Sequence, residues 1–206
     1  MKKTYFAPLL VIALVAVTGI YLFAGNGRKA ESPLAEKTAE SQSSGFSKSL
    51  ANGPLAAFLV HAQRKDIAAF SFIDETNAIK NLGQWQGKVV LLNLWATWCA
   101  PCRKEMPDIA KLQAELGSAD FEVIALSVDR KGLVASKAFL KEIGAESLQV
   151  YAEPEGKSLI ALQAIGLPAT LLIDRKGKEA GRLLGAADWA SPEAKALVQA
   201  LIAEKP

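Results

Sequence analysis

The chain has two cysteines, Cys99 and Cys102, and they lie three positions apart in the stretch WCAPC. Across the first turn of a helix, two thiols at this spacing face each other and can change between dithiol and disulfide with little backbone movement. Unpaired N–H groups and the helix dipole favour a negative charge at a helix N-terminus. We therefore expect Cys99 to be the thiolate and the nucleophile. Cys102, one turn further on, is expected to be more buried and to resolve a mixed disulfide from inside.

The residues next to the cysteines fit this chemistry. Ala100 and Pro101 separate the two thiols, and the proline removes a backbone donor and stiffens the turn. Trp95 and Trp98 are expected to form flat apolar walls around the site.

Two other interpretations of the cysteine pair are weaker. A zinc site needs about four protein ligands, or three and a water, and the single histidine, His61, lies far upstream. We interpret His61 as a packed or solvated helix residue, and expect neither a metal nor a cofactor. A purely structural bridge between Cys99 and Cys102 would close a very short loop, so it would stabilise little through loop entropy.

The composition bounds the class of protein. A chain of 206 residues, half of them hydrophobic, suits one domain with a substantial core plus appendages. The 24 basic and 21 acidic residues leave a net charge of +3. No basic stripe with interleaved aromatic residues is present, so nucleic acid is not an expected partner. No feature of the sequence indicates oligomerisation, and we expect a monomer.

The first part of the chain is predicted to lie outside the folded domain. Residues 4–25 carry no charge and are numerous enough to span a bilayer as a helix. We predict an uncleaved membrane anchor over residues 1–25, with a cleaved signal peptide or a buried helix as alternatives. Such an anchor most often exports the domain that follows it. We therefore expect a single-pass protein of the inner (cytoplasmic) membrane whose soluble domain faces the periplasm.

The composition changes again before the domain. Residues 26–53 are rich in Ser, Glu, Lys and Ala, which predicts a flexible linker. An ordered polar extension is the alternative. The domain itself is expected over residues 54–206.

Hydrophobic patterns within the domain predict alternating helices and strands. Strands are expected where apolar runs are short or continuous, namely at residues 69–73, 78–80, 88–96, 121–128, 148–151, 170–173 and 179–184. Helices are expected where apolar residues recur at helical spacing or follow a capping residue, namely at residues 54–62, 99–116, 134–143, 157–164 and 191–203. Pro107 is expected to kink the helix that carries the cysteines. This alternation indicates an α/β layered domain with an antiparallel hairpin near its end.

Two segments resemble a known family. The run from Trp95 to Pro107, within GKVVLLNLWATWCAPCRKEMP, resembles the active-site signature of the thioredoxin superfamily, and IGLPATLLIDRKGK is a second, weaker match. More narrowly, the chain resembles the TlpA group of membrane-anchored, extracytoplasmic thioredoxins over residues 69–203. The resemblance implies a thioredoxin-like fold, with a central mixed β-sheet flanked by helices and a helix-strand insert at residues 134–164. An N-terminal transmembrane helix would precede this fold.

The same resemblance implies where a client protein binds. Pro168 falls where the superfamily has a cis-proline packed against the disulfide, so the resemblance predicts a cis bond between Leu167 and Pro168. In the family, the backbone before that proline pairs with an extended segment of the substrate. Trp98, Leu167 and Pro168 are therefore the candidate substrate-binding residues.

One position departs from plain thioredoxin. The buried acid six residues before the first cysteine is replaced by Asn93, which cannot accept a proton near neutral pH. Water or another group must then deprotonate Cys102, and Glu105 is the candidate side chain. Arg103 and Lys104 can stabilise the Cys99 thiolate by charge, or they simply form a solvated basic helix edge.

The resemblance implies a thiol:disulfide oxidoreductase that reduces client disulfides in cytochrome maturation or cytochrome oxidase assembly. A membrane thiol donor would then re-reduce the Cys99–Cys102 pair. Three alternatives stay open at this point: a disulfide oxidant, a copper chaperone on a similar fold, and a binding module without activity. The copper chaperones use a wider cysteine spacing and a downstream histidine, and this chain has no histidine after His61.

Overall fold

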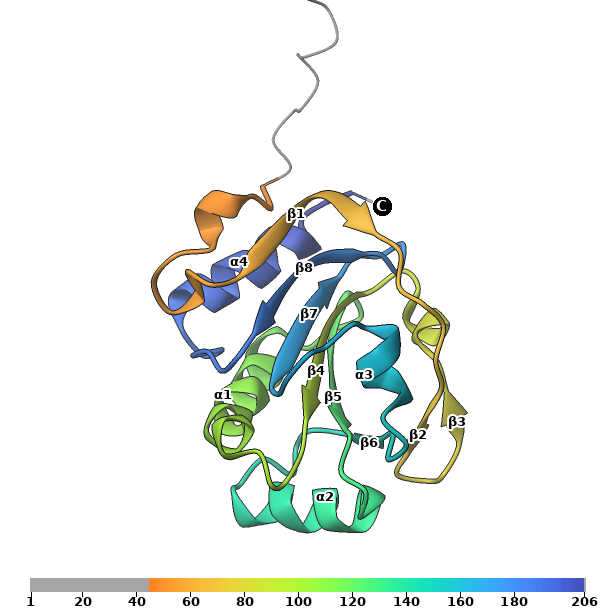
Figure 1. Cartoon of the computed structure of the whole chain (residues 1–206). Helices are drawn as coiled ribbons and strands as arrows, with labels where there is room; N and C mark the ends of the chain where they lie inside the picture. The colour runs from red at the N-terminus through yellow and green to blue at the C-terminus, as the bar shows by residue number, and fades with distance from the viewer. Residues whose placement is uncertain (1–44, 206) are drawn as a thin grey trace, which may run out of the picture. The chain divides into compact units, whose positions relative to one another are not determined.

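A single mixed sheet organises the domain. The computed structural model describes residues 45–205 (Figure 1). Within this range, eight strands pair in the order β1-β8-β7-β4-β5-β6-β2-β3. The strands are β1 (Leu59–Lys65), β2 (Phe72–Asp74), β3 (Ile79–Lys80), β4 (Val89–Trp95), β5 (Phe121–Ser127), β6 (Val150–Ala152), β7 (Ala169–Ile173) and β8 (Glu179–Leu184). Only the β4–β5 and β5–β6 pairs are parallel.

Helices cover both faces of this sheet. The α-helices are α1 (Ala100–Leu116), α2 (Gly132–Glu142), α3 (Lys157–Ala161) and α4 (Pro192–Ile202). Three short 3₁₀ helices are η1 (Lys48–Leu50), η2 (Gly53–Leu55) and η3 (Leu82–Trp85). In Figure 1, α1 and α4 lie on one face of the sheet and α3 lies on the other. The expected α/β architecture, with a mixed sheet flanked by helices, is confirmed.

Strand β4 is the centre of the domain. All seven of its residues are buried, and it pairs with β5 on one side and β7 on the other. A continuous apolar run is what a strand covered on both faces requires, so this prediction is confirmed. The chain then enters α1 and crosses over to β5, which is parallel to β4.

Helix α1 also follows its sequence pattern. Met106, Ile109 and Leu112 recur at helical spacing, and all three are buried. Pro107 lies inside the helix, as predicted. Burial of this apolar stripe against the sheet stabilises the helix even though the proline removes one backbone hydrogen bond.

The segment at residues 54–62 was expected to be helical, and that expectation is wrong. The chain makes the short η2 turn and then forms β1, which pairs antiparallel with β8 at the edge of the sheet. A helix this short is marginal in water, whereas β8 offers backbone partners to a strand beside it. Leu55 and Phe58 lie in the core. His61 is consequently a strand residue and not a helix residue.

The packed domain extends further upstream than residue 54. Phe46 is buried, and the guanidinium of Arg64 lies 4.9 Å from the centre of its ring. The predicted anchor over residues 1–25 and residues 26–44 of the predicted linker lie outside the described residues. Between residues 45 and 205, no helix is both long enough and apolar enough to cross a bilayer.

The remaining elements follow the predictions closely. The two expected hairpins are present as β2–β3 and β7–β8. The expected insert at residues 134–164 corresponds to α2, β6 and α3, although α3 ends at Ala161, three residues earlier than predicted.

Candidate active site

The cysteine pair lies where β4 ends and α1 begins. Cys99 is the N-cap residue of α1, and its Sγ accepts a hydrogen bond from the N–H of Cys102 at 3.3 Å. The two residues form a disulfide with their Cα atoms 5.3 Å apart. Donors at this helix N-terminus point toward Cys99, so they would favour its thiolate when the disulfide is reduced.

The two sulfurs differ in how they can be reached. A surface groove of about 480 Å³ opens onto Cys99 but not onto Cys102. Cys99 is 5 % exposed and Cys102 is fully buried. A sulfur of another protein can therefore meet Cys99 first, which agrees with the roles predicted for the two thiols.

The groove beside Cys99 is apolar. Its lining residues, none of them charged, are Trp98, Cys99, Ala100, Pro101, Leu159, Ala164, Ile165, Gly166 and Leu167. Trp98 is 69 % exposed and Ile165 is 91 % exposed. Two large apolar side chains in water mark a surface that is suited to contact with another molecule. Leu159 and Ile165 come from α3 and the loop after it, and no local sequence pattern placed them at this site.

The predicted cis-proline lies beside this groove. The peptide bond between Leu167 and Pro168 is cis. Ala169, the next residue, pairs with Leu94 of β4, which brings Pro168 to the end of the sheet where the cysteines lie. Leu167 lines the groove, while Pro168 is buried behind it. Trp98 and Leu167 thus line one groove and Pro168 follows Leu167 directly, while the role of the three residues in binding a client stays a prediction.

Trp95 does not line the groove, so the prediction for this residue is wrong. It is completely buried, and its ring centre lies 5.6 Å from that of Phe139 in α2. Trp95 is the last residue of β4. Because both faces of β4 are covered, its side chain packs into the core and only Trp98 remains at the surface.

Glu105 is buried on α1, one helical turn after Cys102. It is 2 % exposed, and its carboxylate accepts hydrogen bonds from Asn93 Nδ2 (2.8 Å), the N–H of Ala187 (3.2 Å) and Trp189 Nε1 (3.3 Å). Burial raises the pKa of Glu105, and these three donors only partly offset it, so that the pKa is about 7. A carboxyl group with this pKa can accept and release a proton under neutral conditions.

Asn93 connects Glu105 to the sheet. Its Nδ2 also donates to Thr170 Oγ1 at 2.9 Å, and its Oδ1 is buried without a hydrogen-bond partner among the described residues. The position that holds an acid in plain thioredoxin is therefore occupied here by an amide that bonds to an acid on the helix. Sequence alone pointed to Glu105 but not to Trp189, Ala187 or Thr170, because these lie far away along the chain.

The basic residues after Cys102 point elsewhere. The guanidinium of Arg103 lies 4.6 Å from the centre of the Phe139 ring and donates to Glu142 Oε1 (3.3 Å) and to the carbonyl of Thr97 (3.4 Å). Lys104 is exposed. Of the two interpretations, the basic helix edge agrees better with this arrangement than a direct role in holding the thiolate.

His61 is remote from the cysteines. It lies on β1, which β8 and β7 separate from β4 in the sheet order. Its Nε2 is 2.6 Å from Glu179 Oε1, which Arg182 also contacts. Residues 45–205 contain no group of three or more His, Cys, Asp and Glu side chains arranged to hold a metal ion. His61 therefore cannot complete a site with Cys99 and Cys102, as a copper or zinc protein would require.

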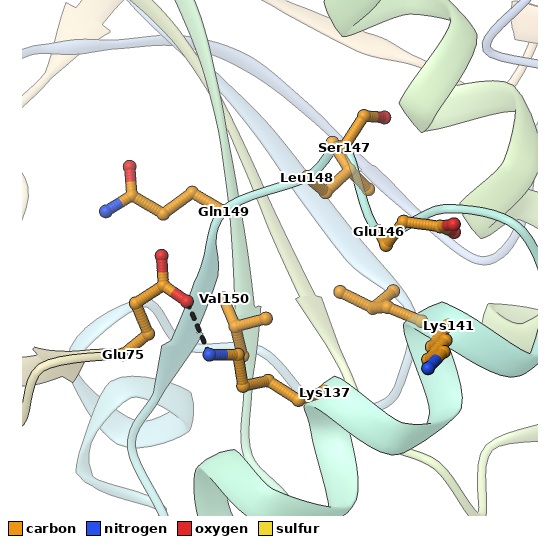
Figure 2. A pocket seen from close by; sticks show the side chains of 9 residues that line it. Glu75, Lys137, Lys141, Glu146, Ser147, Leu148, Gln149 and Val150 are labelled. Atoms are coloured by element: carbon orange, nitrogen blue, oxygen red, sulfur yellow. Dashed lines mark ion pairs between the residues drawn. The ribbon is translucent and has the colours of Figure 1, made fainter.

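A second pocket, of about 490 Å³, lies along α2 and the loop before β6 (Figure 2). Its charged lining includes Lys137, Lys141 and Glu146, and Glu75 of the β2–β3 turn forms an ion pair with Lys137 at 2.7 Å. No cysteine lines this pocket. Its lining is charged on one part and apolar on another and has no redox group, so the groove at Cys99 is the candidate active site.

Comparison with known proteins matches the chain to redox proteins. The Redoxin family model matches residues 63–198. Thiol-disulfide oxidoreductase ResA from Bacillus thuringiensis (strain Al Hakam) is 37 % identical over 101 residues, which is 48 % of this chain and 57 % of the relative. ResA from Bacillus subtilis (strain 168) is 34 % identical over 107 residues, 52 % of this chain and 59 % of the relative. The match thus spans less than two thirds of these curated relatives.

Solved structures agree with the fold. A candidate thiol:disulfide interchange protein DsbE from Chlorobium tepidum superposes with a TM-score of 0.57 at 31 % identity, covering 69 % of this chain and 98 % of that one. The exposed lipoprotein thioredoxin Etrx1 from Streptococcus pneumoniae (strain TIGR4) gives a TM-score of 0.52 at 28 % identity, covering 65 % and 98 % of the two chains.

Proposed function

This chain belongs to the redoxin family within the thioredoxin superfamily, and we propose that it is a thiol:disulfide oxidoreductase acting through Cys99 and Cys102. One observation carries the proposal. The apolar groove reaches Cys99 while its partner Cys102 is fully buried beneath it. This arrangement gives one thiol to the client and keeps the other for resolution.

The reaction follows from these positions. With the pair reduced, the Cys99 thiolate attacks one sulfur of a client disulfide, forms a mixed disulfide and releases the other client sulfur as a thiolate, which takes up a proton from solvent. Cys102 then loses its proton and attacks the Sγ of Cys99. The client leaves with two thiols, having gained two electrons, and this chain keeps the Cys99–Cys102 disulfide.

Glu105 is the group proposed to take the proton from Cys102. The two residues are three positions apart on α1, so they lie on the same side of the helix. A pKa of about 7 makes Glu105 a better base for a thiol than an exposed glutamate, because it matches the thiol pKa more closely. In this chain the role held by a strand acid in plain thioredoxin is thus taken by a helix acid.

The clients and the location are part of the same proposal. The resemblance to the TlpA group supports a reductant of client disulfides in cytochrome maturation or cytochrome oxidase assembly, re-reduced by a membrane thiol donor. The uncharged residues 4–25 support an anchor in the inner membrane with the domain in the periplasm. The alternative is that this chain oxidises its clients, with electrons flowing from the client to the Cys99–Cys102 disulfide. Experiment must distinguish these two directions.

Trapping tests the mechanism. In Cys102→Ser the mixed disulfide between Cys99 and the client cannot be resolved, so a covalent complex should accumulate and disappear on addition of dithiothreitol. The matched control is Cys99→Ser, which should trap nothing. Identification of the trapped protein by mass spectrometry names the client. Absence of any trapped species in Cys102→Ser would contradict the exchange mechanism.

Redox titration tests the direction. The full chain is equilibrated in glutathione buffers of different potential. Alkylation then traps the free thiols, and the fraction of Cys99–Cys102 disulfide is measured. A potential near that of thioredoxin, about −270 mV, agrees with a reductant. A potential near that of DsbA, about −120 mV, would reverse the assigned direction.

A further inference from the structure

Thr97 lies in the turn that joins β4 to Cys99, and a buried carboxylate holds it there. Asp129 lies two residues after the end of β5 and is 3 % exposed. Its Oδ2 accepts hydrogen bonds from the N–H of Thr97 at 3.2 Å and from the Thr97 hydroxyl. One carboxylate oxygen therefore fixes both the backbone and the side chain of the residue two positions before Cys99.

Asp129 is itself firmly placed. Its Oδ1 accepts from the N–H of Lys131 at 2.9 Å, and its own N–H donates to Ser127 Oγ at 3.2 Å. The preceding residue, Val128, donates its N–H to the carbonyl of Trp95 at 2.9 Å. Burial raises the pKa of Asp129, but the bonds from Thr97 and Lys131 outweigh it and leave the pKa below its usual value.

Arg103 holds the same turn from the helix side. Its guanidinium donates to the carbonyl of Thr97 while it stacks on Phe139 of α2. The N–H, the hydroxyl and the carbonyl of Thr97 are all bonded as a result. Cys99 is tied to the same turn, since its N–H donates to the carbonyl of Ala96 at 3.1 Å.

We propose that Asp129 is a positioning residue for the redox pair, which acts through Thr97 to fix the turn that carries Cys99. A fixed turn keeps the Cys99 sulfur within reach of the Cys102 sulfur, so their effective concentration toward each other is high. Releasing the turn lowers that concentration and favours the dithiol over the disulfide. The inference rests on the proposed function only in requiring that the pair cycles between these two states.

The molecule contains a matched control for this contact. Asp74, also buried, accepts from the N–H of Thr76 at 2.8 Å and from its hydroxyl at 2.6 Å. This second Asp–Thr pair is in the β2–β3 turn, and β5 and β6 separate β2 from β4 in the sheet order. Loss of either threonine hydroxyl removes one hydrogen bond to a buried carboxylate, so the two losses are comparable.

The experiment compares Thr97→Val, Asp129→Ala and Asp129→Asn with Thr76→Val in the full chain. The equilibrium constant between the disulfide and the dithiol is measured in glutathione buffers. Thr97→Val and Asp129→Ala should shift it about tenfold toward the dithiol, which is about 30 mV for two electrons. Asp129→Asn, which retains one acceptor, should shift it less. Thr97→Ser, which restores the hydroxyl, and Thr76→Val should stay within about twofold of wild type.

The outcomes separate this inference from the proposed function. Thr97→Val and Thr76→Val should lower the melting temperature similarly, so a change in the equilibrium constant confined to Thr97→Val reports on the site and not on stability. Should Asp129→Ala fail to fold, Thr97→Val still decides. Equal equilibrium constants in wild type and Thr97→Val overturn the positioning role alone. A wild-type pair that even excess dithiothreitol leaves as the disulfide cannot cycle, and this result overturns both the proposed function and this inference.

Discussion

Glu105 and Glu179 are two buried glutamates with opposite behaviour. Each is 2 % exposed. Burial raises the pKa of both, yet the pKa of Glu105 ends at about 7 while that of Glu179 ends below its usual value. The difference lies in the partners, because Glu179 faces the guanidinium of Arg182 and the ring of His61.

The donors around Glu105 are neutral. They are the Asn93 amide, the Trp189 indole and the N–H of Ala187. Because none of them carries a positive charge, they stabilise the carboxylate less than a cation does. Glu179 is ion-paired with Arg182 and contacts His61 of β1, whereas Glu105, three residues after Cys102, has no cation among the partners of its carboxylate. Burial alone therefore does not make a carboxylate functional; the charge of its partners decides.

Removing the charge of Glu179 is expected to have the largest effect on stability. Glu179→Gln should lower the free energy of unfolding by about 3–5 kcal/mol at pH 7, because it leaves Arg182 largely buried without its counter-charge. Urea denaturation measures the loss. Redox exchange per folded molecule should be unchanged, and a variant as stable as wild type would contradict the role assigned to the ion pair.

Removing the charge of Glu105 is expected to raise the free energy of unfolding at high pH, which is opposite to the effect expected at Glu179. A pKa raised from 4.5 to about 7 means that the folded state holds its proton longer than the unfolded state, so this group costs stability as pH rises through that window. The shift corresponds to about 3 kcal/mol at most. Glu105→Gln should therefore gain stability over wild type at pH 8 and lose this advantage near pH 4. A difference independent of pH would contradict the raised pKa.

The pH dependence of Glu179→Gln should run the other way. Because the pKa of Glu179 is lowered in the folded state, its stabilising effect is present above the ordinary glutamate pKa and is lost as pH falls through the folded value. The deficit of the variant against wild type should shrink in acid. Urea titrations of both glutamine variants between pH 4 and pH 8 test the two signs in one series.

Kinetics should single out Glu105. Loss of a general base commonly costs about 100-fold or more in rate. In Glu105→Gln, resolution of a mixed disulfide by Cys102 should slow by about this factor, and the rise in rate with pH through about 7 should disappear. Stopped-flow release of a preformed mixed disulfide measures this step. Glu179→Gln is the matched control, and equal rates in the two variants would contradict the proton-acceptor role.

The smallest effect is expected from the hydrogen bond between Trp189 and Glu105. The indole of Trp189 lowers the pKa of Glu105 through one neutral hydrogen bond. Trp189→Phe removes that bond, so the pH midpoint for resolution should move upward, by an amount in keeping with about 1 kcal/mol. A downward shift of the midpoint would show that the indole does not stabilise the carboxylate.

Local sequence patterns were sufficient for most of the elements near the cysteines. The apolar run of β4, the helical spacing of Met106, Ile109 and Leu112, and the hairpins were all predicted. Such patterns are short-range, because a strand or helix covered by a core must repeat apolar residues at its own period. The segment at residues 54–62 failed because pairing with β8 outweighed its helical spacing.

The sequence by itself predicted a redox pair, from two thiols three residues apart at an expected helix start, and it named Glu105 as a candidate acid. Only the tertiary structure decided that Glu105 is buried among neutral donors, that Trp95 belongs to the core, and that Asp129 reaches back to Thr97. Burial and partner charge depend on residues far apart along the chain, such as Glu105 and Trp189. No local sequence pattern predicts that Glu105 and Trp189 are in contact. Their contact depends on the order of the strands and on the packing of the helices against them.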